Sequence, residues 1–223
     1  MSILKKIVLA GGMIVASATY ANVVPAYDIE AGKAIVESNC GACHGVNGIS
    51  IAPAQPNLAG QNIRYLYKQL VDFKTGARAN GIMKAQLQGL TQQDLANVAG
   101  YFAAQAPWTP GYGDKKTAHE ATKLFLGGDK SRGVIPCAGC HGPKGGGNEW
   151  AGFPRLGGQH ATYIATQLKL FRAAGRDDEG LMPEQMRHND SAKPDEKGMM
   201  QVVASRLSDR DIRILSDYIT ALH

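Results

Sequence analysis

The four cysteines of the chain lie in two Cys-x-x-Cys pairs, and a histidine follows each pair directly. In a helix the two thiols of such a pair lie on one face, about one turn apart, so both reach the same edge of a porphyrin and form thioethers with its vinyl groups. The adjacent imidazole then points at the iron, and this pattern is an attachment signature for c-type haem. We therefore predict two covalently attached haem c groups. The predicted thioether residues are Cys40, Cys43, Cys137 and Cys140, and the predicted proximal iron ligands are His44 and His141.

Three other uses of paired cysteines explain the pattern less well. A redox dithiol needs neither a histidine beside each pair nor a second pair. A structural zinc site places its two halves about 15–20 residues apart, whereas these pairs are 97 residues apart. Disulfides leave His44 and His141 without a role.

The N-terminus has the three parts of a secretory signal. Lys5 and Lys6 precede a short apolar run, Ile7–Val15, and small residues follow it. Ala18 and Ala21 are the two candidate cleavage sites, so we assign residues 1–21 to a signal peptide. The apolar run is shorter than the roughly 20 residues that span a bilayer. We expect an exported protein that is not anchored.

The composition of the chain excludes few classes of protein, but its net charge bears on the choice of binding partner. The chain has 223 residues, 44% hydrophobic and 19% charged, as in ordinary globular proteins. The formal charge of +5 falls to +3 without the two signal lysines, and two haems would add four propionate groups. A nucleic-acid partner therefore gains no support from charge.

The two halves of the chain repeat each other. The Cys-x-x-Cys-His-Gly segments match at an offset of 97, and Pro56–Gln61 matches Pro154–Gln159 at an offset of 98. The C-terminal segments match at 117, so the second half carries about 19 extra residues between Arg176 and Met200. An ordered match of this length indicates a tandem duplication.

Apolar residues recur at helical spacing in both halves, and no segment shows sustained strand alternation. We expect short helices from Asp28 to Cys40 and from Ala118 to Leu126. The two last helices begin with capping boxes, Thr91–Asp94 and Ser208–Asp211. The Pro- and Gly-rich stretch Pro107–Gly113 is the predicted linker. The predicted domains are residues 22–110 and 111–223, both all-α.

Each iron needs a sixth ligand or an open site. Methionine sulfur opposite histidine raises the reduction potential and closes the iron, which suits electron transfer. Met83 lies seven residues before Leu90, and Met200 lies seven residues before Leu207. The repeat thus places both methionines equivalently, in loops before the last helices, and we predict that they are the sixth ligands.

An iron-bound histidine usually donates its other ring nitrogen to an oxygen. Carbonyl groups in the loops after the motifs are the natural acceptors, and Pro56 and Pro154 occupy matching positions there. Four further residues repeat at an offset of 98 and are candidates for contact with haem propionates. They are Tyr65, Arg78, Tyr163 and Arg176.

Taken in order, these segments resemble the dihaem cytochrome c4 family, in which each half is a class I cytochrome c domain. The resemblance rests on CGACHG and CAGCHG, PNLAGQ, YLYKQLVDF, FPRLGGQHATYIATQL, LTQQDLANVAGYF and VVASRLSDRDI, and it covers nearly the whole mature chain. It implies periplasmic electron carriage, two domains packed so that their haems communicate, and axial pairs His44–Met83 and His141–Met200. The stretch from Gly175 to Lys197 is longer than the family leads us to expect. It is either a tolerated surface insertion or a partner-docking surface.

The leading hypothesis is a carrier, not an enzyme, that accepts single electrons from a quinol-oxidising complex or dehydrogenase and passes them to a terminal cytochrome c oxidase. One alternative is a cytochrome subunit of a larger dehydrogenase, for example a flavocytochrome. A dihaem peroxidase or thiosulfate-oxidising enzyme is disfavoured, because a closed ligand sphere leaves no place for substrate. Peripheral membrane association and the choice between monomer and dimer stay open.

Overall fold

The computed structural model describes residues 24–109, 111–178, 180, 186–191, 193 and 196–223. The predicted signal peptide lies outside these residues, as does Pro110 at the predicted domain boundary. The described chain forms helices and no strand, apart from two isolated bridges, Asp129 with Val134 and Asn148 with Phe153. The all-helical prediction is confirmed.

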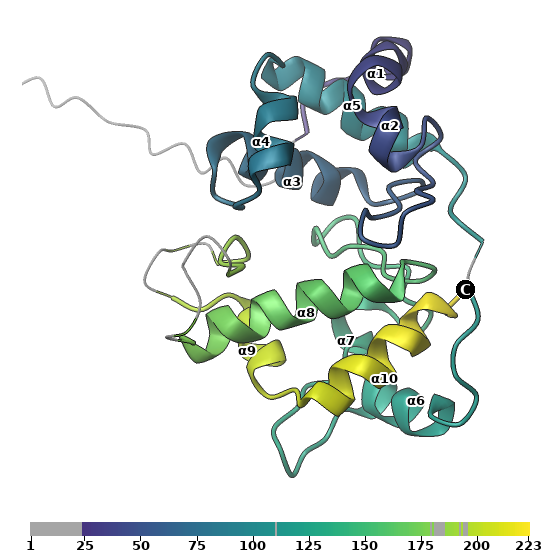
Figure 1. Cartoon of the computed structure of the whole chain (residues 1–223), viewed down its shortest axis with the longest axis vertical. Helices are drawn as coiled ribbons and strands as arrows, with labels where there is room; N and C mark the ends of the chain where they lie inside the picture. The colour runs from purple at the N-terminus through teal and green to yellow at the C-terminus, as the bar shows by residue number, and fades with distance from the viewer. Residues whose placement is uncertain (1–23, 110, 179, 181–185, 192, 194–195) are drawn as a thin grey trace, which may run out of the picture.

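The first half contains α1 (Ile29–Ile35), a π-helical stretch (Val36–Cys40), α2 (Gly41–His44), α3 (Ile63–Thr75), α4 (Gly81–Leu87) and α5 (Gln92–Ala104). The second contains α6 (Ala118–Gly127), α7 (Ala138–His141), α8 (Ala161–Arg176), α9 (Met199–Ser205) and α10 (Asp209–Thr220). Figure 1 shows the halves stacked along the long axis, with one linker joining them at the side. The same order of helices in each half follows from the duplication.

Each half has its own hydrophobic core. Phe102 of α5 is buried in the first core, and Phe125 of α6 is buried in the second. The first and last helices of the first half cross closely at Gly32, where a Cβ atom would lie 2.2 Å from the carbonyl oxygen of Asn97. A side chain at Gly32 would therefore separate α1 from α5.

Both last helices begin with the predicted capping boxes. The Thr91 hydroxyl accepts from the Asp94 amide and the Asp94 carboxylate accepts from the Thr91 amide, and Ser208 and Asp211 repeat the exchange. These bonds satisfy amides at a helix start that have no partner within the helix. The boxes fix where α5 and α10 begin after the methionine-bearing segments.

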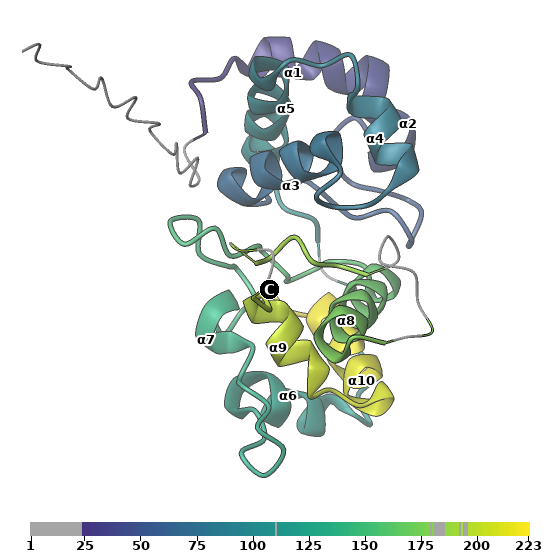
Figure 2. The ribbon, with the colours of Figure 1, turned by 90° about the vertical axis from the view of Figure 1, so that its left-hand side faces the viewer.

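The two halves meet through a reciprocal exchange of hydrogen bonds. The Gln61 side chain donates to the Arg155 carbonyl (2.8 Å) and accepts from the Arg155 amide (2.7 Å). Gln159 does the same with the carbonyl (2.8 Å) and amide (2.9 Å) of Asn57. Both glutamines are 7% exposed. Since the residues pair at the repeat offset of 98, the halves are related by an approximate two-fold axis that passes through this interface. Figure 2 shows the two halves on opposite sides of the interface.

Candidate haem sites

Each Cys-x-x-Cys-His segment forms a single helical turn. α2 begins after Cys40 and α7 begins after Cys137, and the histidine is the last residue of each helix. Gly45 ends α2 with φ of +73°, a conformation that favours glycine, and a Cβ atom there would lie 2.3 Å from the Ile49 carbonyl oxygen. The chain therefore turns sharply after the motif, and each pair of cysteines shares one helical face.

His44 and His141 are buried, at 8% and 5% exposure. Their Nδ1 atoms lie 3.0 Å from the carbonyl oxygens of Pro56 and Pro154, respectively. A carbonyl only accepts, so Nδ1 carries the proton and the Nε2 lone pair is left for a metal. Burial lowers the pKa of both histidines, and the hydrogen bond to proline opposes this without reversing it. Both imidazoles are therefore held neutral in the tautomer that binds iron.

The proline carbonyls lie in a loop that backbone hydrogen bonds close in each half. The Gly48 carbonyl accepts from the amides of Leu58 (2.7 Å) and Ala59 (3.0 Å). In the second half the Gly145 carbonyl accepts from Leu156 at 2.7 Å and Gly157 at 3.0 Å. The two loops thus bring the carbonyl group beside the histidine in the same way.

Met83 and Met200 lie on short helices and not in loops, which corrects the sequence prediction. Met83 is in α4 and Met200 is in α9, and both are half-buried against the core of their own half. The Asn80 side chain accepts from the Met83 amide at 2.9 Å, and the Asp190 carboxylate accepts from the Met200 amide at 2.6 Å. A side-chain cap therefore fixes the backbone of each methionine.

The four thiols form no disulfide, although all of them lie in the described part of the chain. Cys43 and Cys140 are exposed, while Cys40 and Cys137 are partly covered. Burial raises the pKa of the Cys40 and Cys137 thiols to about 11.

The donor set of each half suits an iron porphyrin. The described residues contain no group of three or more His, Cys, Asp or Glu side chains that would hold a metal ion by themselves. A porphyrin supplies four nitrogen ligands in its plane, so one histidine and one methionine complete the coordination. The paired thiols, the fixed imidazole and the capped methionine of each half therefore fit a haem attached through thioethers.

The candidates for propionate contact fall into two groups. Tyr65, Tyr163 and Arg78 lie at the interface between the halves, where Arg78 donates to the Tyr163 hydroxyl at 3.0 Å. Arg176 does not: it is exposed and donates to the carbonyls of Ser205 (2.9 Å) and Leu207 (3.0 Å) within its own half. Arg176 is therefore not the counterpart of Arg78 at the interface.

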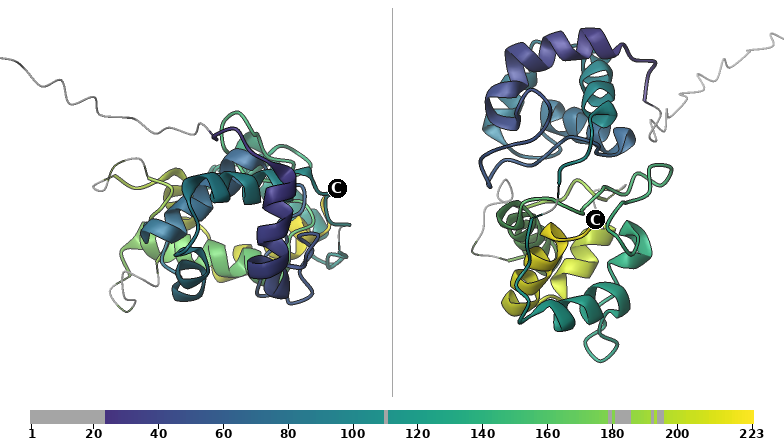
Figure 3. Two further views of the ribbon diagram at one scale, coloured as in Figure 1. Left: turned by 90° about the horizontal axis from the view of Figure 1, so that it is seen from above. Right: turned by 90° about the vertical axis from the view of Figure 1, so that its right-hand side faces the viewer.

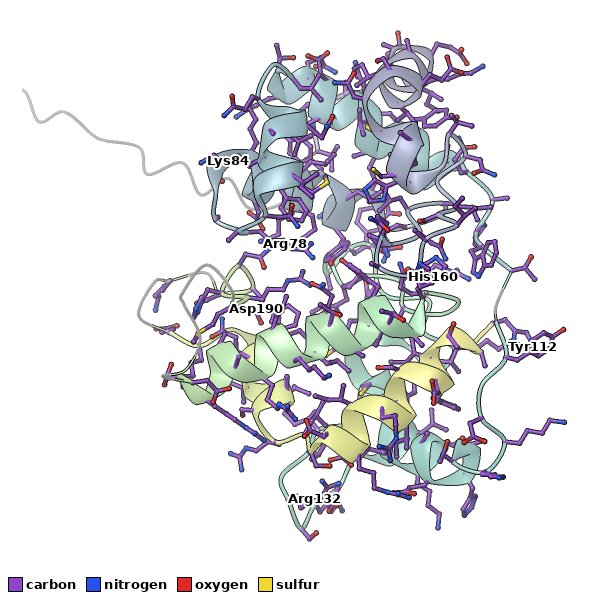
Figure 4. All side chains as sticks on the ribbon, in the orientation of Figure 1. Arg78, Lys84, Tyr112, Arg132, His160 and Asp190 are labelled. Carbon is purple, nitrogen blue, oxygen red and sulfur yellow. The ribbon has the colours of Figure 1, made fainter. Side chains whose placement is uncertain are left out.

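Sequence reasoning missed the arginine that does reach the interface. Arg187 is 6% exposed and donates to the Tyr65 hydroxyl at 3.1 Å. The available signal was Arg-x-Asn, which occurs at Arg78–Asn80 and again at Arg187–Asn189. His160 was also undervalued: its Nε2 lies 3.0 Å from the Ser50 carbonyl of the other half, and Figure 4 shows it on the edge that faces that half.

Comparison with known proteins agrees with this geometry. The sequence model of the family described as cytochrome c matches the chain twice, at residues 29–105 and 135–223. The fold and its two sites thus define a tandem c-type cytochrome.

Cytochrome c4 of Stutzerimonas stutzeri is 44% identical over 88% of this chain and 90% of its own length. The crystal structure of reduced recombinant cytochrome c4 from Pseudomonas stutzeri has a TM-score of 0.74 at 43% identity and covers 89% of this chain and 100% of its own. The chain belongs to the cytochrome c4 family, and it carries two covalent haem c groups, one for each domain. A more distant relative, a thiosulfate dehydrogenase electron acceptor of Stutzerimonas stutzeri strain A1501, is 33% identical over 80% of this chain and 76% of its own length.

None of the helices in the described part of the chain is long and apolar enough to span a membrane.

Proposed function

We propose that this dihaem electron-transfer protein works in the periplasm as a carrier. It takes single electrons from a quinol-oxidising complex or a dehydrogenase and delivers them to a terminal cytochrome c oxidase. The observation that supports a carrier is the pair of equivalent sites, each with a buried neutral histidine and a capped methionine. The predicted export signal, which lies in residues 1–21, supports the location.

His44 with Met83, and His141 with Met200, are the proposed axial pairs. Each haem iron supplies the one-electron ferric–ferrous couple. The protein holds the histidine Nδ1 proton on a proline carbonyl, so the imidazole stays in one orientation and is a stronger ligand. A thioether ligand favours the ferrous state and raises the reduction potential.

Closed coordination at both irons also implies that the chain has no catalytic turnover of its own. With both axial positions held by side chains, peroxide or another substrate has no place to bind. We therefore infer that the protein is a carrier and not an enzyme, as its cytochrome c4 relatives are carriers.

The interface supports exchange of electrons between the halves. The glutamine bonds of Gln61 and Gln159 hold the domains in one arrangement. A fixed arrangement lets an electron that enters at one haem leave from the other without a domain rearrangement. Figure 3 shows the first half lying directly over the second when the molecule is seen from above.

A second candidate is electron acceptor to a thiosulfate-oxidising enzyme. It is favoured by the relative named as a thiosulfate dehydrogenase electron acceptor. In that case the same haem domains receive electrons from a dedicated dehydrogenase, and the donor differs while the chemistry of this chain does not.

Stopped-flow mixing of the purified holoprotein tests the proposal. The ferrous protein should be oxidised rapidly by membranes that contain a terminal cytochrome c oxidase, and the ferric protein should bind cyanide slowly. The ferric protein should also be reduced by a quinol-oxidising complex faster than by thiosulfate dehydrogenase with its substrate. The reverse preference would favour the second candidate. Rapid cyanide binding, or turnover of peroxide, would contradict a closed carrier.

A further inference from the structure

Arg78 reaches across the interface from the first half. Its guanidinium donates to Gln69 of its own half at 2.7 Å, and to Tyr163 (3.0 Å) and Gln167 (2.8 Å) of the second. It lies over the Phe73 ring, 4.4 Å from the centroid. Figure 4 shows Arg78 on the edge of the first half that faces the second. One guanidinium therefore touches both domains.

Arg187 makes the same contacts with the halves exchanged. It donates to Gln167 of its own half at 2.9 Å, and to Tyr65 (3.1 Å) and Gln69 (3.0 Å) of the first. It lies over Phe171, 4.2 Å from the centroid. The tyrosine, glutamine and phenylalanine partners of the two arginines pair at the repeat offset of 98. Arg187 is thus the spatial counterpart of Arg78.

The segment that carries Arg187 is fixed to the first half. Asn189 donates to Gln69 (3.0 Å) and to the Asp72 carboxylate (2.6 Å), and its carbonyl accepts from Lys68 at 2.6 Å. The next residue, Asp190, accepts from the Met200 amide. The segment between Arg176 and Met200 therefore includes a stretch that forms part of the interface, and the residue that follows it supports α9.

The interface holds more positive than negative charge. Arg78 and Arg187 share the side-chain oxygens of Gln69 and Gln167, which are neutral acceptors. The Asp72 carboxylate is connected to this group through its bond to Asn189, and it already pairs with Lys68. Burial raises the pKa of Tyr65, but the charges of Arg187, Arg78 and Lys68 outweigh burial and lower it.

Two guanidiniums that share buried acceptors are costly unless an anion lies near them. Each haem c carries two propionate carboxylates, and the planar guanidinium fork matches a carboxylate well. Because the halves are related by an approximate two-fold axis, an anion near Arg78 in the first half has a counterpart near Arg187 in the second.

We infer that Arg187 is a positioning residue for electron transfer. With Arg78 it completes a two-arginine bridge across the domain interface, whose positive charge would attract the haem carboxylates and raise the reduction potentials of both haems. The bridge rests on the two haem groups and on their proposed relay role. Its charge acts on both halves because each guanidinium contacts both.

Spectroelectrochemical titration of holoprotein variants tests the bridge without any partner protein, so its outcome is independent of the donor and acceptor. R187Q should lower both midpoint potentials, each by on the order of tenfold in the reduction equilibrium constant, which is about 59 mV for one electron. R187K, which keeps the charge, should restore most of the shift. R213Q, which removes an exposed arginine of α10 in the same half, should leave both potentials nearly unchanged.

The mirror variant R78Q serves if R187Q yields no holoprotein, and it should also lower both potentials. A shift confined to one haem would show that each arginine serves a single half and would overturn the bridge. So would unchanged potentials in R187Q, or an equal fall in R187K and R187Q, because the charge would then not be the cause.

Discussion

The two halves of the molecule support their cofactors in the same way but reach their methionines by different routes. Met83 lies five positions after Arg78 in the first half, and Met200 lies thirteen positions after Arg187 in the second. Yet both arginines cross the interface, and Asn80 and Asp190 both cap the methionine helix. The same contacts are therefore made in both halves, although the number of residues between the arginine and the methionine differs. Extra residues are thus accommodated on either side of the Arg-x-Asn segment but not within it.

The halves also differ in how strongly the last helix is capped. Asp94 is half-buried and bonds only to Thr91 of its own box. Asp211 is 5% exposed and adds an ion pair with Arg132 at 2.6 Å. Arg132 also pairs with Asp129 at 2.6 Å, so it connects the Asp129–Val134 turn to α10. In the second half, ion pairs therefore connect the turn that precedes the haem-attachment motif to the last helix.

The largest expected effect comes from removing one attachment motif at a time. Replacement of both cysteines of one motif by serine should cost one haem and about half of the haem absorbance, because each pair grips its own porphyrin. The matched variants are C40S/C43S and C137S/C140S, with intact mass as the measurement. If either variant retained two haems, the two motifs would not be independent.

Next in size are the interface glutamines. Gln61→Ala leaves the amide and carbonyl of the half-buried Arg155 without a partner, and Gln159→Ala leaves those of the buried Asn57, at about 1–3 kcal/mol for each group. Because the bonds are related by the two-fold axis, the two variants should lower the free energy of unfolding by similar amounts. Chemical denaturation of the holoprotein measures this, with Gln92→Ala as an exposed control. A large difference between the two variants would argue against symmetric docking.

Smaller effects are expected at the methionine helices. Asn80→Ala removes one cap, at about 1 kcal/mol. Asp190→Ala should cost more, because its carboxylate also accepts from the Gln201 side chain at 2.8 Å. The far-red sulfur–iron charge-transfer band should therefore be lost at a lower temperature in Asp190→Ala than in Asn80→Ala. The opposite order would show that the longer second segment is held by other contacts.

The smallest effect is a dependence on pH. The bonds from Thr91 lower the pKa of Asp94; burial raises the pKa of Asp211, but the bonds from Arg132 and Ser208 outweigh burial and lower it. A lowered pKa in the folded state means that the carboxylate stabilises above its unfolded pKa of about 3.9 and that this is lost as pH falls through the folded value.

Asp211→Asn should therefore cost about 1 kcal/mol at pH 7 and little near pH 2. Asp94→Asn should show a weaker dependence, since it has no ion pair to lose. Thermal melts between pH 7 and pH 2 measure both variants. An equal loss at both pH values for Asp211→Asn would show that its charge does not matter.

Much of the fold was predictable because the sequence repeats. Two aligned copies supplied the helix order, the capping boxes and the equivalence of Met83 with Met200. The helices α4 and α9 were not predicted, because they have only seven residues each and are held by the caps Asn80 and Asp190. Periodicity over one or two turns does not distinguish a helix from a loop.

The interface was not predictable in the same way. A repeat shows which residues correspond but not which surfaces meet, so the pairing of Gln61 with Arg155 had no signal in one chain. Arg187 was missed because Arg176 lies at the offset of 98 that relates α3 to α8. The extra residues place the structural counterpart of Arg78 eleven positions further along the chain, at Arg187. The exact position of an insertion is established from the contacts of the residues around it, and these contacts are known only from the structure.

The axial ligands are tested most directly by the ferric absorption spectra of Met83→Ala and Met200→Ala beside the parent protein. The account predicts that each variant loses about half of the far-red sulfur–iron band, and that the double variant loses all of it. A band that survives in full in either single variant would show that the corresponding iron has another ligand.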